Sequence, residues 1–266
     1  MSVTKEKFNN TLMKFSIMSQ TEKFGLGLRE EIEKLIEKGD LKGLLYKAGE
    51  LHGHLCPYLA YGVMAGYIAV RELNIKNTGM EEIIAIVETN NCFTDGIQVV
   101  TGCSFGNNSL IFKDLGKTAV TVARRDGSAI RIVLDPDFEE SRREEYPEAH
   151  QLWNEIFVER REVSEEKHRR MMRLFAEMSI KELDNPPEKM FKIRRFRIEV
   201  PEYASIFNSV RCSVCGEKVM ETRARVKDGK PVCISCARDA YYFLDGNGIS
   251  MKPQTSQKPR EESDDV

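Results

Sequence analysis

Residues 52–57, with the sequence HGHLCP, bring together side chains that bind metals or carry protons. His52, His54 and Cys56 occupy alternate positions, so an extended backbone would direct all three side chains to one side. The residue before a proline prefers an extended conformation, which favours this arrangement. Imidazole and thiolate ligands suit zinc and other transition metals. The segment therefore predicts a metal site or a site of thiol chemistry.

The helix that should follow begins at Pro57, because proline suits the first position of a helix. Cys56 would then be the N-cap, where the positive end of the helix dipole favours a thiolate. The helix would continue through the mostly apolar residues 58–70. Gly62 and Gly66, four residues apart, leave space in which another element can approach closely. We expect this helix to be central to the fold.

A second segment, residues 90–103, supplies two more thiols and two polar side chains. Thr94 or Asp95 can cap a short helix, and Gln98 follows Asp95 in capping-box spacing. Capping alone would explain Asp95 and Gln98. Cys92 then precedes the helix and Cys103 follows it.

The two thiols of this second segment should not both reach one ion. At 1.5 Å per residue, the ends of a helix over residues 95–101 lie about 10 Å apart. We therefore expect His52 or His54 to join Cys56 and either Cys92 or Cys103. Fewer than four firm protein ligands would suit an open, catalytic type of metal site.

Each member of this cluster also has an ordinary structural interpretation, because single histidines often serve in the core or as caps and free cysteines are usually buried. Their joint arrangement favours a site. Cys56 would be a nucleophile or ligand, and the histidines ligands or proton carriers. The candidate catalytic residues are His52, His54, Cys56, Cys92, Asp95, Gln98 and Cys103.

The strongest metal motif lies near the C-terminus. Cys212 and Cys215 are followed after 17 residues by Cys233 and Cys236, again in Cys-x-x-Cys spacing. Two such pairs offer four thiolates to one ion, as in a zinc ribbon or treble-clef-like finger. We predict a structural Zn²⁺ here. Four equivalent thiolates leave no open position for catalysis.

Charge is unevenly distributed along a chain whose net charge is −2. Residues 137–188 carry a net charge of −6, and residues 189–240 carry +6. Basic residues around the finger could contact phosphate. Without interleaved aromatic residues, a solvated face or a docking surface for the acidic helices of this chain is favoured over nucleic acid, which is not excluded.

The number and spacing of the cysteines, together with the absence of long apolar runs, indicate the cellular compartment. Seven cysteines, four of them in paired spacing, suit a reducing environment better than a secreted disulfide framework. No apolar run approaches the roughly 18 residues of a membrane span, and the first 20 residues do not form a signal peptide. We expect a cytoplasmic protein without membrane contact.

The order of the expected elements indicates an α+β protein. Helices over 22–38 and 41–51 precede the central helix, and strands are expected over 83–87, 118–123 and 129–134. Residues 138–178 should be helical with a break near Val163-Ser164, and 191–200 should form an edge strand. The expected domains are a core over 1–135, a charged helical segment and linker over 136–188, a zinc-finger domain over 189–248 and a disordered tail over 249–266. Residues 1–20 would be a short helix or a loose arm.

Several motifs over about residues 48–134 resemble, in the same order, the core of the FmdE family, which takes its name from one of the subunits of formylmethanofuran dehydrogenase. The matching stretches are 52–57, 88–92, 95–98, 101–103, Gly106 and 110–117. The C-terminal finger is similar to one found on many members. The resemblance implies an α+β core, a pocket lined by the His and Cys positions above and homodimers with the pocket near the contact between the two copies.

The resemblance also implies an association with the subunits of molybdenum or tungsten formylmethanofuran dehydrogenase, an oxidoreductase of one-carbon metabolism in methanogenesis. This chain departs from the family at Tyr58, where glycine is usual, at Gly96, where alanine is usual, and at Asn107-Asn108, where a Lys-Gly pair is common. A tyrosine at the start of the helix would narrow the pocket. The alternative is a non-catalytic accessory or regulatory protein whose finger docks on a protein or nucleic acid.

Overall fold

The structure is a computed structural model that describes residues 27–76 and 78–253. It divides into two compact units, the first ending at Pro201 and the second beginning at Glu202. The first unit combines helices with one five-stranded sheet, and the second consists mainly of small hairpins. The predicted α+β class is confirmed. The expected arm over residues 1–20 lies outside the described residues.

The sheet of the first unit has the strand order β2-β1-β3-β4-β5. Its central strands are apolar on the face that meets the helices, and all five residues of β1 are buried. β1 pairs in parallel with β2, and the other neighbours are antiparallel. The strands are β1 (Ile83–Val87), β2 (Leu110–Phe112), β3 (Ala119–Arg124), β4 (Ser128–Leu134) and β5 (Phe191–Arg197).

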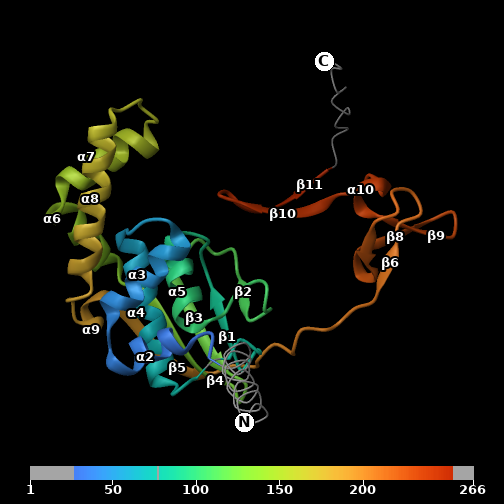
Figure 1. Ribbon diagram of the computed structural model, residues 1–266, viewed down its shortest axis with the longest axis horizontal. Helices are drawn as coiled ribbons and strands as arrows, with labels where there is room; N and C mark the ends of the chain where they lie inside the picture. The colour runs from blue at the N-terminus through green and yellow to red at the C-terminus, as the bar shows by residue number, and fades with distance from the viewer. Residues whose placement is uncertain (1–26, 77, 254–266) are drawn as a thin grey trace, which may run out of the picture. The chain divides into compact units, whose positions relative to one another are not determined.

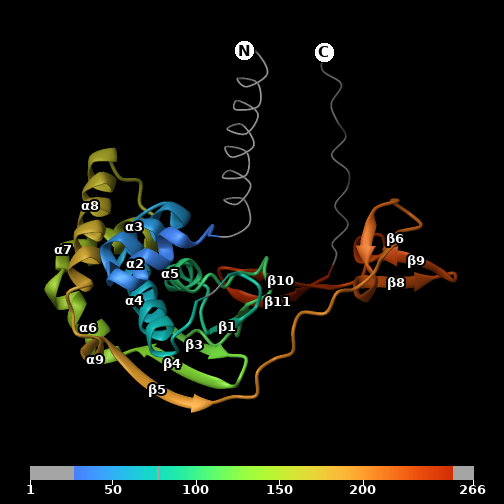
Figure 2. The same cartoon turned by 60° about the horizontal axis from the view of Figure 1, so that its bottom comes forward.

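Four helices lie on one side of this sheet, where α4 and α5 pack on its face and α2 and α3 pack on those two helices (Figure 2). They are α2 (Glu30–Lys38), α3 (Leu41–His52), α4 (Pro57–Glu72) and α5 (Cys92–Thr101). Gly39 ends α2 in the left-handed conformation, and Asp40 caps α3 by accepting from the backbone N–H of Gly43. α4 begins at Pro57 and has 11 buried residues, so it is the central helix that the sequence predicted.

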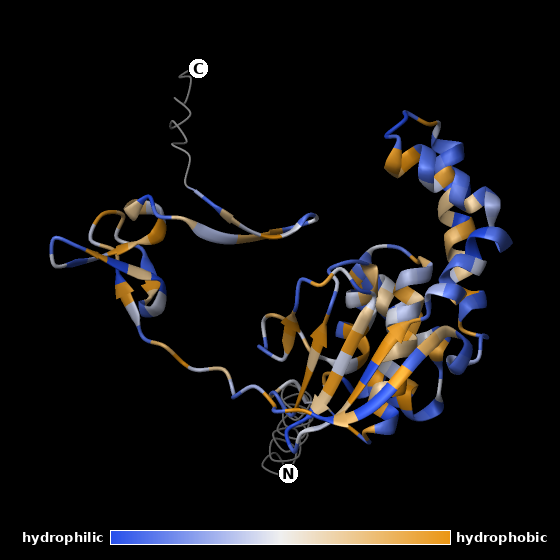
Figure 3. Ribbon diagram, turned by 180° about the vertical axis from the view of Figure 1, so that it is seen from behind, coloured by the Kyte–Doolittle hydropathy of each residue, from blue (hydrophilic) through white to orange (hydrophobic). Residues whose placement is uncertain are grey.

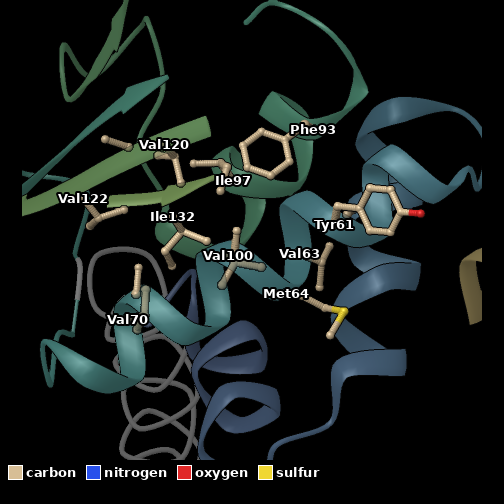
Figure 4. Packing of buried hydrophobic residues seen from close by; sticks show 14 of the residues in the cluster. Tyr61, Val63, Met64, Val70, Phe93, Ile97, Val100, Val120, Val122 and Ile132 are labelled. Carbon is tan, nitrogen blue, oxygen red and sulfur yellow. The ribbon is translucent and has the colours of Figure 1, made fainter. Parts of the chain in front are cut away.

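α4 and α5 cross at very close range through two glycines. A Cβ added at Gly62 would lie 2.0 Å from the carbonyl oxygen of Phe93, and one added at Gly96 would lie 2.5 Å from the backbone nitrogen of Val63. Ile97 and Val100 of α5 then share the core with residues of α4 and the sheet (Figure 4). The crossing accounts for the departure of this chain from the usual alanine at position 96, since a Cβ here would force these two helices farther apart.

A charged helical segment follows β4 (Figures 1 and 3). Its elements are α6 (Pro136–Glu145), α7 (Pro147–Trp153), the π-helical turn η1 (Asn154–Val158), α8 (Glu165–Glu182) and α9 (Pro187–Met190). The predicted break lies between Val158 and Glu165, where Ser164 caps α8. α8 contacts α4 and α7. This segment therefore belongs to the first unit.

The expected domain boundary at residue 189 is wrong, because residues 191–197 form β5 and pair with β4 along its full length. The sequence did predict an edge strand here but joined it to the finger. Pairing with β4 places Ile193 on the helix-covered face of the sheet, where it packs against the main core. The polypeptide therefore leaves the first unit only at Pro201.

Over its described residues, up to 253, the second unit contains three two-stranded antiparallel sheets. The turn at Asp228-Gly229 joins two strands, and both residues have positive φ. The elements are β6 (Ser209–Arg211), β7 (Lys218–Met220), the 3-10 turn η2 (Glu221–Arg223), β8 (Ala224–Lys227), β9 (Lys230–Cys233), α10 (Ile234–Ala237), β10 (Tyr241–Asp245) and β11 (Gly248–Lys252).

The tail predicted to be disordered from residue 249 instead begins with strand β11. Apolar side chains at Ile249 and Met251 pair across the hairpin with Leu244 and Tyr242. Residues 254–266 lie outside the described part of the chain. Among the described residues, no helix has the length and apolar character needed to cross a membrane.

Candidate metal centre

The structure brings four of the predicted side chains together beside the N-termini of α4 and α5. One ligand atom from each of His52, His54, Cys56 and Cys92 lies within 4.8 Å of all the others. Cys56 is buried, and the other three are half-buried. Two nitrogens and two sulfurs at this spacing can surround one borderline-soft metal ion.

The backbone does not bring them together by the extended arrangement expected for residues 52–56, and that expectation is wrong. His52 is the last residue of α3, and Gly53 turns the chain with φ of 88°. Cys56 is extended, with φ of −147°, and is the N-cap of α4 as predicted. The glycine permits the left-handed turn that returns the chain from α3 to α4.

Cys92, not Cys103, completes the cluster. The expected caps Thr94 and Asp95 are wrong, because Asn91 caps α5 by accepting from the backbone N–H of Phe93. The helix therefore begins at Cys92 and includes it. Cys103 lies beyond the other end of α5 and is fully buried. Burial raises its pKa, although Thr101, Ser109 and Arg29 oppose this.

Asp95 and Gln98 orient the cluster. His52 Nδ1 lies 2.7 Å from Asp95 Oδ2, and Gln98 donates to Asp95 Oδ1 at 3.0 Å. When Nδ1 donates to the carboxylate, Nε2 keeps its lone pair and lies 3.9 Å from the sulfur of Cys56. A carboxylate behind a histidine is a common outer partner of a metal ligand. Because Asn91 caps the helix, Asp95 is free for this role.

The surroundings affect the two thiols of the cluster in opposite directions. The interaction with Cys56 and then His52 lower the pKa of Cys92 to about 6, although burial opposes this. The interaction with Cys92, together with burial, raises the pKa of Cys56. A thiolate is therefore favoured at Cys92 over Cys56. The sequence assigned the thiolate to Cys56, but both residues lie at helix N-termini.

His54 stacks at an angle on His52, with ring centroids 4.4 Å apart and planes inclined by 40°. Burial, followed by the neighbouring His52, lowers the pKa of His54. A neutral imidazole at this position can bind a metal or accept a proton.

The four cysteines of the second unit form a zinc site. One sulfur from each of Cys212, Cys215, Cys233 and Cys236 lies within 4.8 Å of the others. The backbone N–H groups of Val214 and Cys233 donate to the sulfur of Cys212 at 3.4 and 3.3 Å. Backbone hydrogen bonds from Cys215 and Cys233 lower the pKa of Cys212 to about 6. The backbone thus favours a thiolate at Cys212, the form that binds zinc, whereas hydrogen bonding with Cys233 raises the pKa of Cys236 to about 12.

Sequence reasoning missed Glu139, which accepts the hydroxyl hydrogen bond of Tyr58 beside the cluster. The two residues are 81 positions apart. No motif connects them, because the contact depends on how α6 packs on α4.

Comparisons with known proteins agree with these two sites. The family model described as "FmdE, Molybdenum formylmethanofuran dehydrogenase operon" matches residues 51–192, and the model for the "Prokaryotic dksA/traR C4-type zinc finger" matches residues 205–242. A protein of Archaeoglobus fulgidus, named "Probable S-adenosyl-L-methionine-binding protein", is 43% identical over 222 residues, or 82% of this chain. The chain spans only 58% of the length of that relative.

A solved structure from Syntrophus aciditrophicus, described as a "tungsten formylmethanofuran dehydrogenase subunit e (fmde)-like protein", is also similar. It is 22% identical with a TM-score of 0.49, and the match covers 74% of this chain and 91% of that chain. The FmdE family model covers more than half of the sequence and contains the whole histidine–cysteine cluster. The chain therefore belongs to the FmdE family and carries a C4-type zinc finger after the FmdE domain.

Proposed function

We propose that the first unit binds one transition metal ion through His52 Nε2, Cys56 and Cys92, with His54 beside the remaining coordination position. Two cysteines and one histidine with an open fourth position form a known type of catalytic zinc site. The bound ion would act as a Lewis acid on a ligand at the open position. Among the donor sets on the described chain, this one is distinguished by its mixture of imidazole and thiolate.

The observation that carries this proposal is the pairing of Asp95 with His52 behind the four clustered ligand atoms. A histidine in an ordinary core or cap would not need a carboxylate that fixes its tautomer. Here Asp95 is itself held by Gln98, so the direction of Nε2 is set by two successive hydrogen bonds. His54 is close enough to the cluster to be a fourth ligand or to hold a proton.

The wider role that we propose is in one-carbon metabolism, in association with formylmethanofuran dehydrogenase subunits and as a homodimer. The name of the family supports the metabolic link. The ligand in the name of the Archaeoglobus relative is a property of that protein, and this chain spans 58% of its length.

Metal content per chain tests the proposal directly. Elemental analysis of the full chain, purified without added metal, should find two metal ions in the wild type and one in Cys56→Ala. Cys103→Ser is the matched control, because Cys103 is also a buried thiol of the first unit but lies at the other end of α5. It should retain both ions.

One outcome would contradict the metal centre, and another would show that the variant had unfolded. One zinc per chain in all three proteins would mean that the finger is the only metal site, and thiol chemistry or simple binding would then remain for the cluster. Loss of both ions in Cys56→Ala would indicate general unfolding. Circular dichroism on the same samples separates that result from selective loss.

The alternative is a non-catalytic accessory or regulatory protein that docks through the finger. Three basic groups of the finger already have partners within the unit: Arg225 pairs with Asp239, Lys227 donates to the carbonyl of Ala237, and Arg211 donates to that of Gly216. These contacts reduce the positive charge that is available to bind phosphate. Binding to nucleic acid that weakens steeply with salt and is abolished by Cys215→Ser would support this alternative.

A further inference from the structure

Glu182, the last residue of α8, carries a buried carboxyl group that the proposed metal centre does not use. The residue is 0% exposed. Its Oε2 accepts from the side-chain amide of Asn185 at 3.0 Å, whereas Oε1 is buried and has no hydrogen-bond partner among the described residues. An ionised carboxylate here would keep an unsatisfied oxygen away from water, which carries a large cost in free energy. The packed structure therefore favours the protonated carboxyl.

The end of α8 that carries Glu182 is packed against two other helices. α8 contacts α4, and Ser179, about one turn before Glu182, is also fully buried. On another side, the ammonium group of Lys181 lies 5.6 Å from the centre of the ring of Tyr146, which ends α6. Water can therefore reach the carboxyl group of Glu182 only if this end of α8 moves away from its neighbours.

The charged and titratable groups that act on Glu182 belong to α4 and α6. Burial raises the pKa of Glu182 to about 7, Arg142 opposes this and Glu145 adds to it. Burial and then Glu182 raise the pKa of Tyr61 in α4. Burial and then Glu145 raise the pKa of Tyr146 to about 12, with a smaller part from Glu182. Arg142 lies 2.6 Å from Glu145, so its charge is already paired with another carboxylate.

We propose that Glu182 is a pH-sensitive switch: the end of α8 stays packed on α4 while the carboxyl is protonated and separates from it when the carboxyl ionises. The ionised carboxylate gains water only in the released state, so ionisation favours release. Release would also remove the apolar side chains of Ile180 and Leu183 from the core, where both now pack. The switch goes beyond the proposed metal centre and does not depend on it.

The size of the effect follows from the protonation of Glu182 in the two states. The pKa is about 7 in the packed state, and in the released state, where water reaches the carboxyl, it returns to 4.5. With these two values, the ratio of released to packed molecules rises about tenfold between about pH 6 and about pH 8.5.

Alkylation of a cysteine introduced into α8 of the full chain measures the released population. Ser179→Cys is nearly isosteric and places a thiol at a fully buried position. Glu177→Cys, made in a separate protein, places a thiol at an exposed position of the same helix and reports how the reactivity of an accessible thiol changes with pH. Iodoacetamide is the probe, and peptide mass spectrometry follows the introduced cysteine in each protein. The quantity compared is the rate at position 179 divided by the rate at position 177.

This rate ratio should rise about tenfold from about pH 6 to about pH 8.5. When Glu182→Gln is added to both proteins, the ratio should not change with pH, because the amide has the shape of the protonated carboxyl and cannot ionise. A ratio that is independent of pH in the presence of Glu182, or that rises equally with Glu182→Gln, would overturn the switch. If circular dichroism shows that Ser179→Cys is unfolded, Met178→Cys takes its place, since Met178 is also buried in α8.

Discussion

Replacement of Gly96 by alanine should force α4 and α5 apart. The added Cβ would lie 2.5 Å from the backbone nitrogen of Val63, 2.6 Å from the carbonyl oxygen of Leu59 and 2.7 Å from the carbonyl carbon of Gly62. All three atoms belong to the backbone of α4, so no side-chain rotation can relieve the contact. The helices must separate by roughly 1 Å to restore ordinary van der Waals distances.

The cost of this separation can be estimated from two opposing terms. Overpacking of a closely packed core costs about 1–3 kcal/mol, and a backbone contact belongs at the upper end of that range. Alanine in place of glycine within a helix returns about 1 kcal/mol. We therefore expect Gly96→Ala to lower the free energy of unfolding of the first unit by about 2 kcal/mol.

Urea unfolding measured by far-UV circular dichroism and tryptophan fluorescence checks this value. The single tryptophan, Trp153, lies in α7 of the first unit, so its fluorescence reports that unit and not the finger. Gly66→Ala should lower the free energy of unfolding by less than Gly96→Ala, because its Cβ would meet the side chain of Val100 at 3.0 Å, and a side chain can adjust. Gly106→Ala is the neutral control, with its nearest neighbour at 3.9 Å.

The same substitution should also affect the metal site. The two helices carry Cys56 and Cys92 at their N-termini, so their separation should weaken the core metal while the finger keeps its zinc. Wild-type stability for Gly96→Ala would refute the account of the helix crossing. Equal destabilisation by Gly106→Ala would refute it as well.

Two further substitutions test the electrostatics. Asp95→Asn should weaken the affinity of the first unit for metal about 10- to 100-fold, because His52 loses the carboxylate that orients it. Metal competition with a coloured chelator should show this loss, while the secondary structure stays unchanged. Burial raises the pKa of Glu182 from 4.5 to about 7. The protonated carboxyl therefore contributes its full share to the free energy of unfolding below pH 4.5, and this contribution is lost as pH rises through about 7. Between about pH 5 and about pH 8, the free energy of unfolding of the wild type should therefore fall by about 2 kcal/mol relative to that of Glu182→Gln. A difference between the two proteins in urea unfolding that does not change with pH would contradict this.

The parts of the molecule that depend on short-range patterns could be predicted from the sequence. Pro57 after Cys56 marked both the start of α4 and its N-cap, and the β-branched run at 83–87 became β1. The spacing of the finger cysteines was sufficient because each Cys-x-x-Cys turn places two sulfurs on the same side. In these cases, the residues that determine the structure are neighbours in the chain.

The choice between Cys92 and Cys103 could not be made in this way, because it depended on where α5 begins. Asn91, Thr94 and Asp95 are all acceptable N-caps, and only packing against α4 selects the first of them. The selection moves Cys92 into the helix and frees Asp95 for His52. The predicted domain boundary at residue 189 was wrong for a related reason. The whole charged helical segment separates β5 from its partner β4 in the sequence.

The helix crossing also explains why this cluster can hold two thiols in a state fit for a metal. Gly62 and Gly96 bring the two helices into backbone contact, and Cys56 and Cys92 stand at the N-termini of those helices. Two positive dipole ends therefore face the same pair of sulfurs, which offsets part of the cost of a buried thiolate. Both glycines lie outside the HGHLCP segment, yet the geometry of that segment depends on them. A chain that kept the histidines and cysteines but lost these two glycines would keep the ligand types and lose the spacing between them.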